Sequence, residues 1–548
     1  MKKLFIQKLQ GLNTDLPERR LPNQRLSDCD NVYFEDMFIK KRWGIDAFPT
    51  GSFSSAIMGI YYYETAISGM KEIIVFTTTH GYYYDDTTGS FNIINRKYVK
   101  GTVEVSGTSV TGTDTEWQTS WSSSYVSMKI GFETTDPDSV TTWYDIESIN
   151  STTDITLSSD GGTISSGASY VLLFCFSGDE DNSFSFEDPY DEKFDDKVVA
   201  ISNGIEPIMI YYGSGNSMKE IGEQDCTTTS SSSTLTVTDS GGMFSGMSVS
   251  GPGIPASTLI DSVTSSTEVE LTDNATASLT DYPLVFGTRR PAKYLGYFGS
   301  VGYEHFISGW IADAIDEPQR LEVSAAGKYP EKFLNDITGD YGTYYLLFDS
   351  PDEIVGIKQL QNRIIIYKEN SITEMMAKPQ GTNADPYNFN QNKIIDVAPI
   401  SNNVVINYGR FHIFMGWDNF YIFDGINTKP IGDEVINSVI RNMNETYIKR
   451  AFAIPIREER LYVIFIPTGD NQLPSQCYAY NYTTGVWTKW TFLDSSGDAI
   501  YFTSWGRWRK SYSPTWAEIE TAGTTWAAMD MRWEDLIIYE NIDRYLLG

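Results

Sequence analysis

Short stretches of alternating hydrophobic and polar residues recur along most of the chain, and polar corners such as Thr88-Gly89, Asp424-Gly425 and Thr484-Gly485 separate them. Alternation with a period of two predicts a β-strand with one buried face, and a tight polar corner between two such stretches predicts a hairpin. The expected strand pairs are Ile73–Phe76 with Gly81–Tyr84, Val198–Ser202 with Pro207–Tyr211, Tyr294–Phe298 with His305–Ser308, Ile354–Leu360 with Arg363–Tyr367, Val404–Asn407 with Phe411–Met415 and Tyr421–Phe423, and Leu461–Ile466 with Cys477–Tyr480 and Trp487–Trp490.

Two segments, residues 101–174 and 226–287, are rich in Ser, Thr, Gly and Asp and resemble each other. In both, an alternating stretch leads through a Ser/Thr turn to a second one (Tyr144 to Leu157, and Thr258 to Leu271), and a further apolar stretch follows after a loop. The recurrence predicts two copies of a small β-sandwich-like inserted domain. Two low-complexity loops are the alternative.

The remaining hairpins are enough for about six to eight four-stranded blades of roughly 40–50 residues each, which predicts an all-β chain built on a β-propeller platform. A chain of β-sandwiches is the alternative. The expected organisation is an N-terminal arm at 1–50, a propeller platform at 51–100, 175–225 and 288–548, inserted β-domain 1 at 101–174 and inserted β-domain 2 at 226–287.

One segment breaks the strand pattern. Between residues 431 and 450, apolar side chains fall at every fourth position, at Ile431, Val435, Val439, Met443 and Tyr447. This spacing predicts one amphipathic helix, with Asp433 and Glu434 in its first turn, where the helix dipole favours anions. The apolar face either packs against the side of the propeller or contacts another subunit.

The 548-residue chain has 41 Lys and Arg against 72 Asp and Glu, a formal net charge of −31. So acidic a chain does not grip nucleic acid over a broad face, because that binding needs concentrated positive charge. The 41% hydrophobic content argues against wholesale disorder. The longest apolar runs are too short for a membrane helix, and the N-terminus lacks the apolar core of a signal peptide, so we expect no membrane insertion by this chain.

Residues for catalysis or metal binding are sparse. Only three histidines occur, at His80, His305 and His412, and the four cysteines lie far apart. No nucleophile elbow, zinc-protease helix or phosphate-binding loop is present. The acidic run at 179–196 does not fit an EF-hand loop, which predicts a solvated linker, with loose cation binding as the alternative. We therefore expect no enzyme activity, cofactor or metal.

Basic side chains gather in the N-terminal arm, at Arg19, Arg20, Arg25, Lys41 and Arg42. In so acidic a protein they are expected to contact acidic surfaces of neighbouring subunits. Stacking on nucleic-acid bases is the alternative.

Several short sequence segments, called phrases below, occur along the chain, and the order in which they follow one another is informative. The chain opens with Gly11-Leu12-Asn13-Thr14, followed by Leu21-Pro22, Asp30-Asn31-Val32 and Lys40-Lys41-Arg42-Trp43-Gly44. Later phrases are Val199-Ala200-Ile201-Ser202-Asn203-Gly204, Ala292-Lys293-Tyr294-Leu295, Glu317-Pro318-Gln319-Arg320-Leu321, Glu353-Ile354-Val355-Gly356-Ile357, Ile366-Tyr367-Lys368-Glu369-Asn370-Ser371-Ile372 and Tyr421-Ile422-Phe423-Asp424-Gly425. In this order the chain resembles the tail nozzle, also called tail hub or tail tubular protein, of short-tailed, podovirus-like bacteriophages.

The resemblance implies a structural virion protein without catalytic residues. Six copies form a ring that docks below the portal and adaptor proteins and extends the channel for DNA ejection, with tail fibres and a plug or needle protein as further partners. DNA passes without specific binding. The chain departs from a minimal nozzle by its two inserts. A receptor-binding or carbohydrate-recognising propeller is the alternative, and a propeller glycosidase is a third possibility.

Two sets of residues are assigned on this basis. An acidic wall repels passing DNA, and the expected channel-lining carboxylates are Asp136, Asp138, Asp261 and Glu268. Ring closure needs heterologous contacts between neighbouring copies. The expected subunit or adaptor contacts are Arg19, Arg20, Arg25, Lys41 and Arg42 of the arm and Val435, Val439, Met443 and Tyr447 of the helix.

Overall fold

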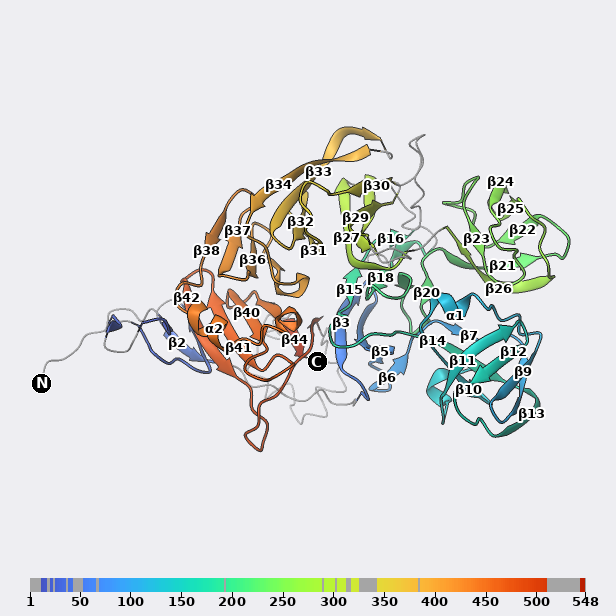
Figure 1. Cartoon of the computed structure of the whole chain (residues 1–548), viewed down its shortest axis with the longest axis horizontal. Coiled ribbons are helices and arrows are strands. Elements are labelled where there is room, and N and C mark those ends of the chain that lie inside the picture. Colours follow the sequence, from blue (N-terminus) through green and yellow to red (C-terminus); the bar gives the residue numbers. More distant parts are fainter. Residues whose placement is uncertain are drawn as a thin grey trace, which may run out of the picture.

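The computed structural model describes residues 11–16, 20–22, 25–35, 38–42, 53–65, 69–191, 194–287, 290–300, 303–311, 317–324, 343–382, 385–509 and 543–547. In this part of the chain, six sheets of four antiparallel strands are arranged around a common centre (Figure 1). They are the blades of a β-propeller, which confirms the fold class expected from the hairpin pattern. We number the blades 1 to 6 in chain order.

Each blade is read from its first to its fourth strand. Blade 1 consists of β3 (Ile57–Glu64), β4 (Lys71–Thr77), β5 (Gly81–Asp85) and β6 (Ser90–Ile93), and blade 2 of β15 (Ser185–Glu187), β18 (Val199–Ser202), β19 (Met209–Tyr211) and β20 (Lys219–Glu220). Blade 3 consists of β27 (Ala292–Ser300), β28 (Tyr303–Ile311), β29 (Glu317–Val323) and β30 (Thr343–Leu346), and blade 4 of β31 (Ile354–Leu360), β32 (Arg363–Lys368), β33 (Ser371–Thr382) and β34 (Asp385–Ile395). Blade 5 consists of β35 (Ile406–Asn407), β36 (His412–Met415), β37 (Phe420–Phe423) and β38 (Thr428–Pro430), and blade 6 of β39 (Phe452–Ile456), β40 (Leu461–Ile466), β41 (Gln476–Asn481) and β42 (Val486–Thr491).

A two-stranded sheet of β43 (Trp505–Arg509) and β44 (Asp543–Leu547) lies between blade 6 and blade 1. On one side, Trp505 packs against the blade 6 core around Phe452. On the other side, Gly506 lies against β3 so closely that a β-carbon there would be 2.2 Å from Cγ2 of Ile60. Only glycine allows this approach, so the sequence at this position helps to close the ring of blades.

The N-terminal arm covers the outer edge of blade 6. Leu12 N donates to Trp487 O (2.9 Å), Asn31 N to Lys489 O (2.8 Å) and Lys489 N to Cys29 O (3.0 Å), so the arm runs beside the edge strand β42. The arm then forms a hairpin of β1 (Val32–Glu35) and β2 (Phe38–Lys41). An open sheet edge invites pairing with other chains, and the arm removes this hazard from blade 6.

The first insert interrupts the chain between blades 1 and 2. It forms one eight-stranded sheet in the order β13-β8-β9-β12-β11-β10-β14-β7, and its aromatic core is continuous with those of blades 1 and 2. Its elements are β7 (Lys97–Tyr98), β8 (Thr102–Ser106), β9 (Ser109–Thr113), α1 (Trp121–Ser124), β10 (Ser127–Phe132), η2 (Pro137–Ser139), β11 (Tyr144–Ser151), β12 (Asp154–Leu157), β13 (Thr163–Ala168) and β14 (Tyr170–Cys175). A small hairpin of β16 (Tyr190–Asp191) and β17 (Asp196–Lys197) follows within blade 2.

The second insert follows blade 2 and forms a six-stranded sheet in the order β23-β26-β21-β22-β25-β24. Its strands are β21 (Glu223–Thr228), β22 (Thr234–Val237), β23 (Val249–Ser250), β24 (Ile260–Ser265), β25 (Glu268–Leu271) and β26 (Leu279–Phe286). The two inserts lie side by side at one end of the molecule (Figure 1), where Tyr282 donates to Asp114 O at 2.9 Å.

The sequence repeat between the inserts reappears as a structural repeat. In the first insert Ile146 pairs with Leu157, and in the second Ile260 pairs with Leu271. Both hairpins have two register shifts at equivalent places, and both are flanked in the same strand order, β8-β9-β12-β11 and β21-β22-β25-β24. These segments are folded modules rather than low-complexity loops.

The helix expected over residues 431–450 is much shorter. Helix α2 covers Ile436–Asn442, and a separate 3-10 turn, η4, covers Ile448–Arg450. Met443 leaves the helix in an extended conformation and forms an antiparallel bridge with Thr468. Asp433 and Glu434 precede the helix instead of occupying its first turn, because the backbone of Glu434 is engaged by Thr14 of the arm (2.9 Å). Backbone contacts with distant residues at both ends, Thr14 and Thr468, therefore make the helix shorter than the spacing of its apolar residues predicts.

Candidate functional site

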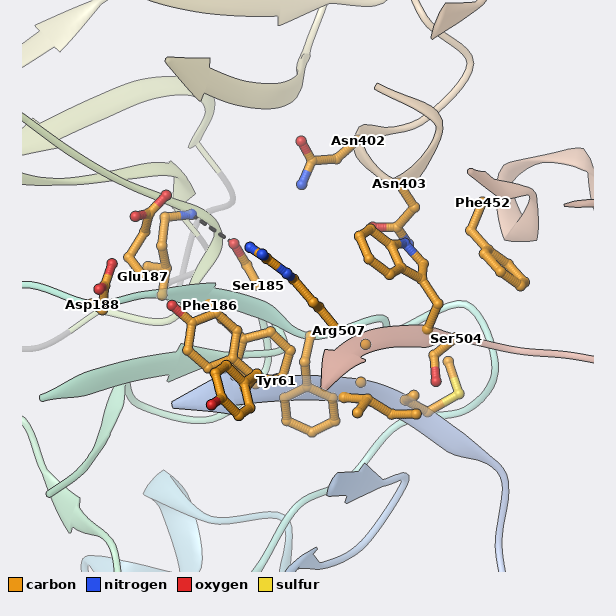
Figure 2. Close-up of a pocket in the computed structure, with 18 of the residues that line it drawn as sticks. Tyr61, Ser185, Phe186, Glu187, Asp188, Asn402, Asn403, Phe452, Ser504 and Arg507 are labelled. Atoms are coloured by element: carbon orange, nitrogen blue, oxygen red, sulfur yellow. Dashed lines mark hydrogen bonds between the residues drawn. The ribbon is translucent and has the colours of Figure 1, made fainter. Parts of the chain in front are cut away.

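The blades surround a cavity of about 790 Å³ on the propeller axis (Figure 2). Its wall takes residues from all six blades and their connections: Tyr61 of β3, Phe186 of β15, Leu295 of β27, Lys358 of β31, Asn402 of the 3-10 helix η3 (Asn402–Val404) and Phe452 of β39. Residues 503–507, at β43, complete the wall between Phe452 and β3. We call this space the axial cavity.

Aromatic and aliphatic side chains form much of the frame. The rings of Tyr61 and Phe186 are stacked, with centroids 5.2 Å apart and planes inclined by 25°. Phe452 and Trp505 contribute further aromatic surface. A hydrogen bond from Leu295 N to Ser185 Oγ (3.0 Å) joins the first strands of blades 2 and 3. The wall therefore combines aromatic rings with polar side chains, and this hydrogen bond joins two neighbouring blades at the cavity.

Charged side chains occupy another part of the wall. Asp188 pairs with Lys197 at 2.5 Å (Oδ2 to Nζ). Burial raises the pKa of Glu187 to about 8, and the neighbouring Asp188 carboxylate adds to the rise. Burial also lowers the pKa of Lys358, while the Glu187 carboxylate opposes this decrease. Each of these two lysines therefore has a carboxyl group as its neighbour.

Two polar groups offer further hydrogen bonds. The side chains of Asn402 and Arg507 point into the axial cavity (Figure 2). Ser504 is only 7% exposed, and its Oγ has no hydrogen-bond partner among the described residues. A buried hydroxyl without a partner is costly, so Ser504 gains a hydrogen bond if its side chain turns toward a ligand in the adjoining cavity.

The sequence predicts a solvated acidic linker at residues 179–196. This prediction is wrong for the middle of the segment. Glu187 and Asp188 line the axial cavity. Asp181 instead reaches Arg450, with Nε and Oδ1 2.6 Å apart. Composition alone indicates a uniform acidic run, whereas β15 and the residue after it place Glu187 and Asp188 at the cavity.

The expected subunit contacts in α2 need correction. Val435 and Val439 are 0% and 2% exposed and belong to the core shared by blades 4, 5 and 6. They cannot contact another subunit in this fold, because the propeller itself covers the apolar stripe. Met443 and Tyr447 are half-buried, and the guanidinium of Arg450 lies 4.6 Å from the Tyr447 ring centroid.

The basic residues of the arm divide into two groups. Arg25 forms an ion pair with Glu434, and Arg42 donates to Asn31 Oδ1 (2.6 Å) and to Thr491 O (2.7 Å), so both hold the arm on blade 6. Arg20 and Lys41 are exposed. Arg19 lies outside the described residues. A contact of these side chains with another subunit stays a prediction.

The four expected channel carboxylates lie on the inserts. Asp136 caps η2 by accepting from Asp138 N (3.3 Å), and Asp138 accepts from Ile93 N (2.9 Å), while Asp261 and Glu268 lie on β24 and β25. None of the four lines the axial cavity. Their place in a channel between subunits stays a prediction.

The three histidines are engaged in the fold. His412 is fully buried, with Nδ1 2.7 Å from the Tyr367 hydroxyl and Nε2 2.9 Å from Gln359 O, and His305 Nδ1 lies 2.7 Å from Ser324 O. His80 Nδ1 lies 2.8 Å from the Thr79 hydroxyl.

In the described part of the chain, no group of three or more His, Cys, Asp or Glu residues is placed to hold a metal ion. Over the same residues, no helix is long and apolar enough to cross a membrane.

His412 makes stability pH-dependent. Burial lowers its pKa to about 4, below the ordinary value of 6.5, so the unfolded chain takes up a proton first as the pH falls. The contribution of neutral His412 to the free energy of unfolding is present above pH 6.5 and is lost progressively toward pH 4. Between pH 7 and pH 5, we expect wild type to lose about 2 kcal/mol more than His412→Gln in urea denaturation. Equal losses would contradict a neutral, buried His412.

Sequence reasoning missed the axial cavity itself. Tyr61, Glu187, Lys358, Asn402 and Ser504 are far apart in the chain and match no motif. The one local signal is that Glu187 follows Phe184-Ser185-Phe186, an aromatic alternation that places a carboxyl group at the end of a buried strand.

Comparisons with known proteins do not identify a family for this chain. No family model and no curated protein match the sequence. Among solved structures, the chain is similar to the computationally designed protein Ika8 (8% identity, covering 83% of this chain and 91% of that chain, TM-score 0.29). It is also similar to the WD40 domain of Pan2 from Neurospora crassa (7%, 59% and 81%, TM-score 0.26) and to AztD from Citrobacter koseri (8%, 77% and 95%, TM-score 0.25). With TM-scores this low, these likenesses carry no argument about function.

Proposed function

We propose that the chain is a structural protein of the tail of a short-tailed bacteriophage, a nozzle whose six copies form a ring below the portal and adaptor proteins. The ring surrounds the path of the ejected genome, and tail fibres and a plug or needle protein attach to it. The order of the sequence phrases along the chain carries this assignment, because their sequence from Gly11 to Gly425 resembles that of tail nozzle proteins.

The placement of the opening phrases supports the assignment. Asn13 Oδ1 accepts from the backbone N–H groups of Asp15 and Leu16 (both 3.1 Å), and Gly11 has a φ of +80° against Val486. Asn31 and Arg42 make the hydrogen bonds that hold the arm on blade 6. These residues form one structural unit, the docked arm, so their joint occurrence in the sequence has a physical basis.

The charge distribution also fits a conduit. The segment 101–174 has ten carboxylates and one lysine, and the segment 226–287 has six carboxylates and no Lys or Arg. A surface with this excess repels a polyanion instead of retaining it. The axial cavity is the size of a small-molecule site and is too small for a DNA duplex, so the conduit in this proposal is the opening at the centre of the ring.

Mass photometry of the purified chain, alone and with a portal–adaptor complex, tests the assignment. We expect a six-copy ring that joins the portal–adaptor complex, and no shift of duplex DNA by the chain in gel electrophoresis at physiological salt. A chain that remains a monomer or trimer and does not join the complex would contradict the nozzle and favour a receptor-binding propeller. Hydrolysis of a polysaccharide by the chain would favour a glycosidase.

A further inference from the structure

The axial cavity combines aromatic side chains, polar side chains and balanced charge. We propose that it is a binding site for a neutral saccharide of one or two sugar units. This site is independent of the ring interfaces, so it goes beyond the nozzle function and does not depend on it.

The size of the cavity suits such a ligand. Small-molecule sites in proteins have volumes of roughly 300–1,000 Å³, and the axial cavity has about 790 Å³. Its wall comes from the first strands of five blades and from η3, so the groups that would contact the ligand are held by the propeller platform rather than by one loop. A preformed site loses little conformational entropy on binding.

Aromatic side chains give the cavity surfaces for the C–H faces of a sugar ring. The stacked pair Tyr61 and Phe186 lies on one part of the wall, and Phe452 and Trp505 lie on another. Figure 2 shows Tyr61, Phe186 and Phe452 around the same space. Such rings bury large apolar areas with few rotatable bonds, which favours a flat, partly apolar ligand.

The polar groups suit a ligand that both donates and accepts hydrogen bonds. Ser504 Oγ is buried without a partner among the described residues. Asn402 and Arg507 point into the cavity with N–H donors, while Glu187 and Asp188 add carboxyl oxygens. A sugar hydroxyl donates and accepts at once and can satisfy each of these groups. A carboxylate ion only accepts.

Charge balance argues for a neutral ligand. The charged side chains of the wall are three carboxyl groups and three cations: Glu64, Glu187, Asp188, Lys197, Lys358 and Arg507. Lys197 is paired with Asp188, and Lys358 lies near Glu187. An anion entering the cavity would approach these carboxyl groups, and a cation would approach the ammonium groups. Strong binding of an ion requires an excess of the opposite charge in the site, and this wall offers no such excess to an anion or to a cation.

Ligand-detected NMR titration tests the site. The probes are glucose, galactose, rhamnose, N-acetylglucosamine and maltose, with citrate and inorganic phosphate as anionic comparators. We expect at least one saccharide to bind and both anions to fail. Ser504→Ala should raise its dissociation constant by about three- to tenfold, because it removes a hydroxyl group. Glu187→Gln should raise it by about tenfold or more, because it replaces a carboxyl oxygen that accepts from a sugar hydroxyl with an NH2 group that cannot accept.

Matched controls lie on the surface. Ser496→Ala and Glu147→Gln make the same chemical changes at exposed positions and should leave the dissociation constant unchanged. An unchanged thermal unfolding midpoint shows that each variant is folded. If no saccharide binds, if the anions bind instead, or if cavity and control variants behave alike, the proposed site is wrong. Ring formation by mass photometry is a separate readout, so a failure here leaves the nozzle assignment to its own test.

Discussion

Replacing Glu223 with glutamine is expected to lower the free energy of unfolding by about 3–5 kcal/mol and to loosen the two inserts from the propeller. Glu223 begins β21, and its Oε2 lies 2.5 Å from Nε of Arg96, which precedes β7. The two side chains are only 7% and 5% exposed. Glutamine keeps the shape of Glu223 but leaves the buried guanidinium of Arg96 without its carboxylate.

The surroundings of Arg96 explain the size of the effect. Burial alone would lower the pKa of Arg96, but Glu223, Tyr125 and Glu220 together more than offset this and the pKa is raised. The guanidinium lies 4.2 Å from the Phe174 ring centroid, and the Tyr125 hydroxyl donates to Glu220 at 2.9 Å. This one network joins blade 1, blade 2 and both inserts, so its loss affects their mutual docking.

Urea denaturation and limited proteolysis measure the outcome, with Asp145→Asn as the control. Asp145 pairs with Lys129 at 2.5 Å, but it is 61% exposed. Surface pairs contribute little, so we expect a change below about 1 kcal/mol. Glu223→Gln should also expose new cleavage sites near the inserts. Equal, small effects of the two substitutions would show that the buried pair does not hold the inserts.

Replacing Phe34 with alanine is expected to cost about 3–5 kcal/mol and to release the N-terminal arm from blade 6. Phe34 is 3% exposed and belongs to the core around Val486 and Trp487. Its carbonyl accepts from Asn481 Nδ2 at 2.9 Å. A cavity at this position weakens the packing that holds β1 beside β41 and β42.

Ile39→Ala is the matched control, because Ile39 lies on β2 of the same hairpin and is 44% exposed. We expect it to change the free energy of unfolding by less than about 0.5 kcal/mol. Thermal unfolding and size-exclusion chromatography report both changes, and Phe34→Ala should also raise the tendency to associate through the uncovered edge of β42. Similar midpoints and elution volumes for the two variants would contradict a stabilising role of the arm.

The axial cavity could not be predicted from the sequence. Its carboxyl groups sit in a run of acidic residues that has the composition of a solvated linker, and its serine and asparagine match no pattern. Likewise, Val435 and Val439 have the spacing of an exposed amphipathic stripe, yet the propeller core covers them. Spacing identifies an apolar face but does not say what covers it.

The sequence by itself determined the strands, the hairpins and the repeat of the inserts, because alternation and turn residues are local properties that act over a few positions. It even aligned Ile146 with Ile260 in the register that the two inserts share. Only the tertiary structure decided which residues meet on the propeller axis and where the helix ends. Ring closure brings Tyr61, Glu187, Lys358 and Ser504 together from different blades, and no local pattern records contacts made over such separations.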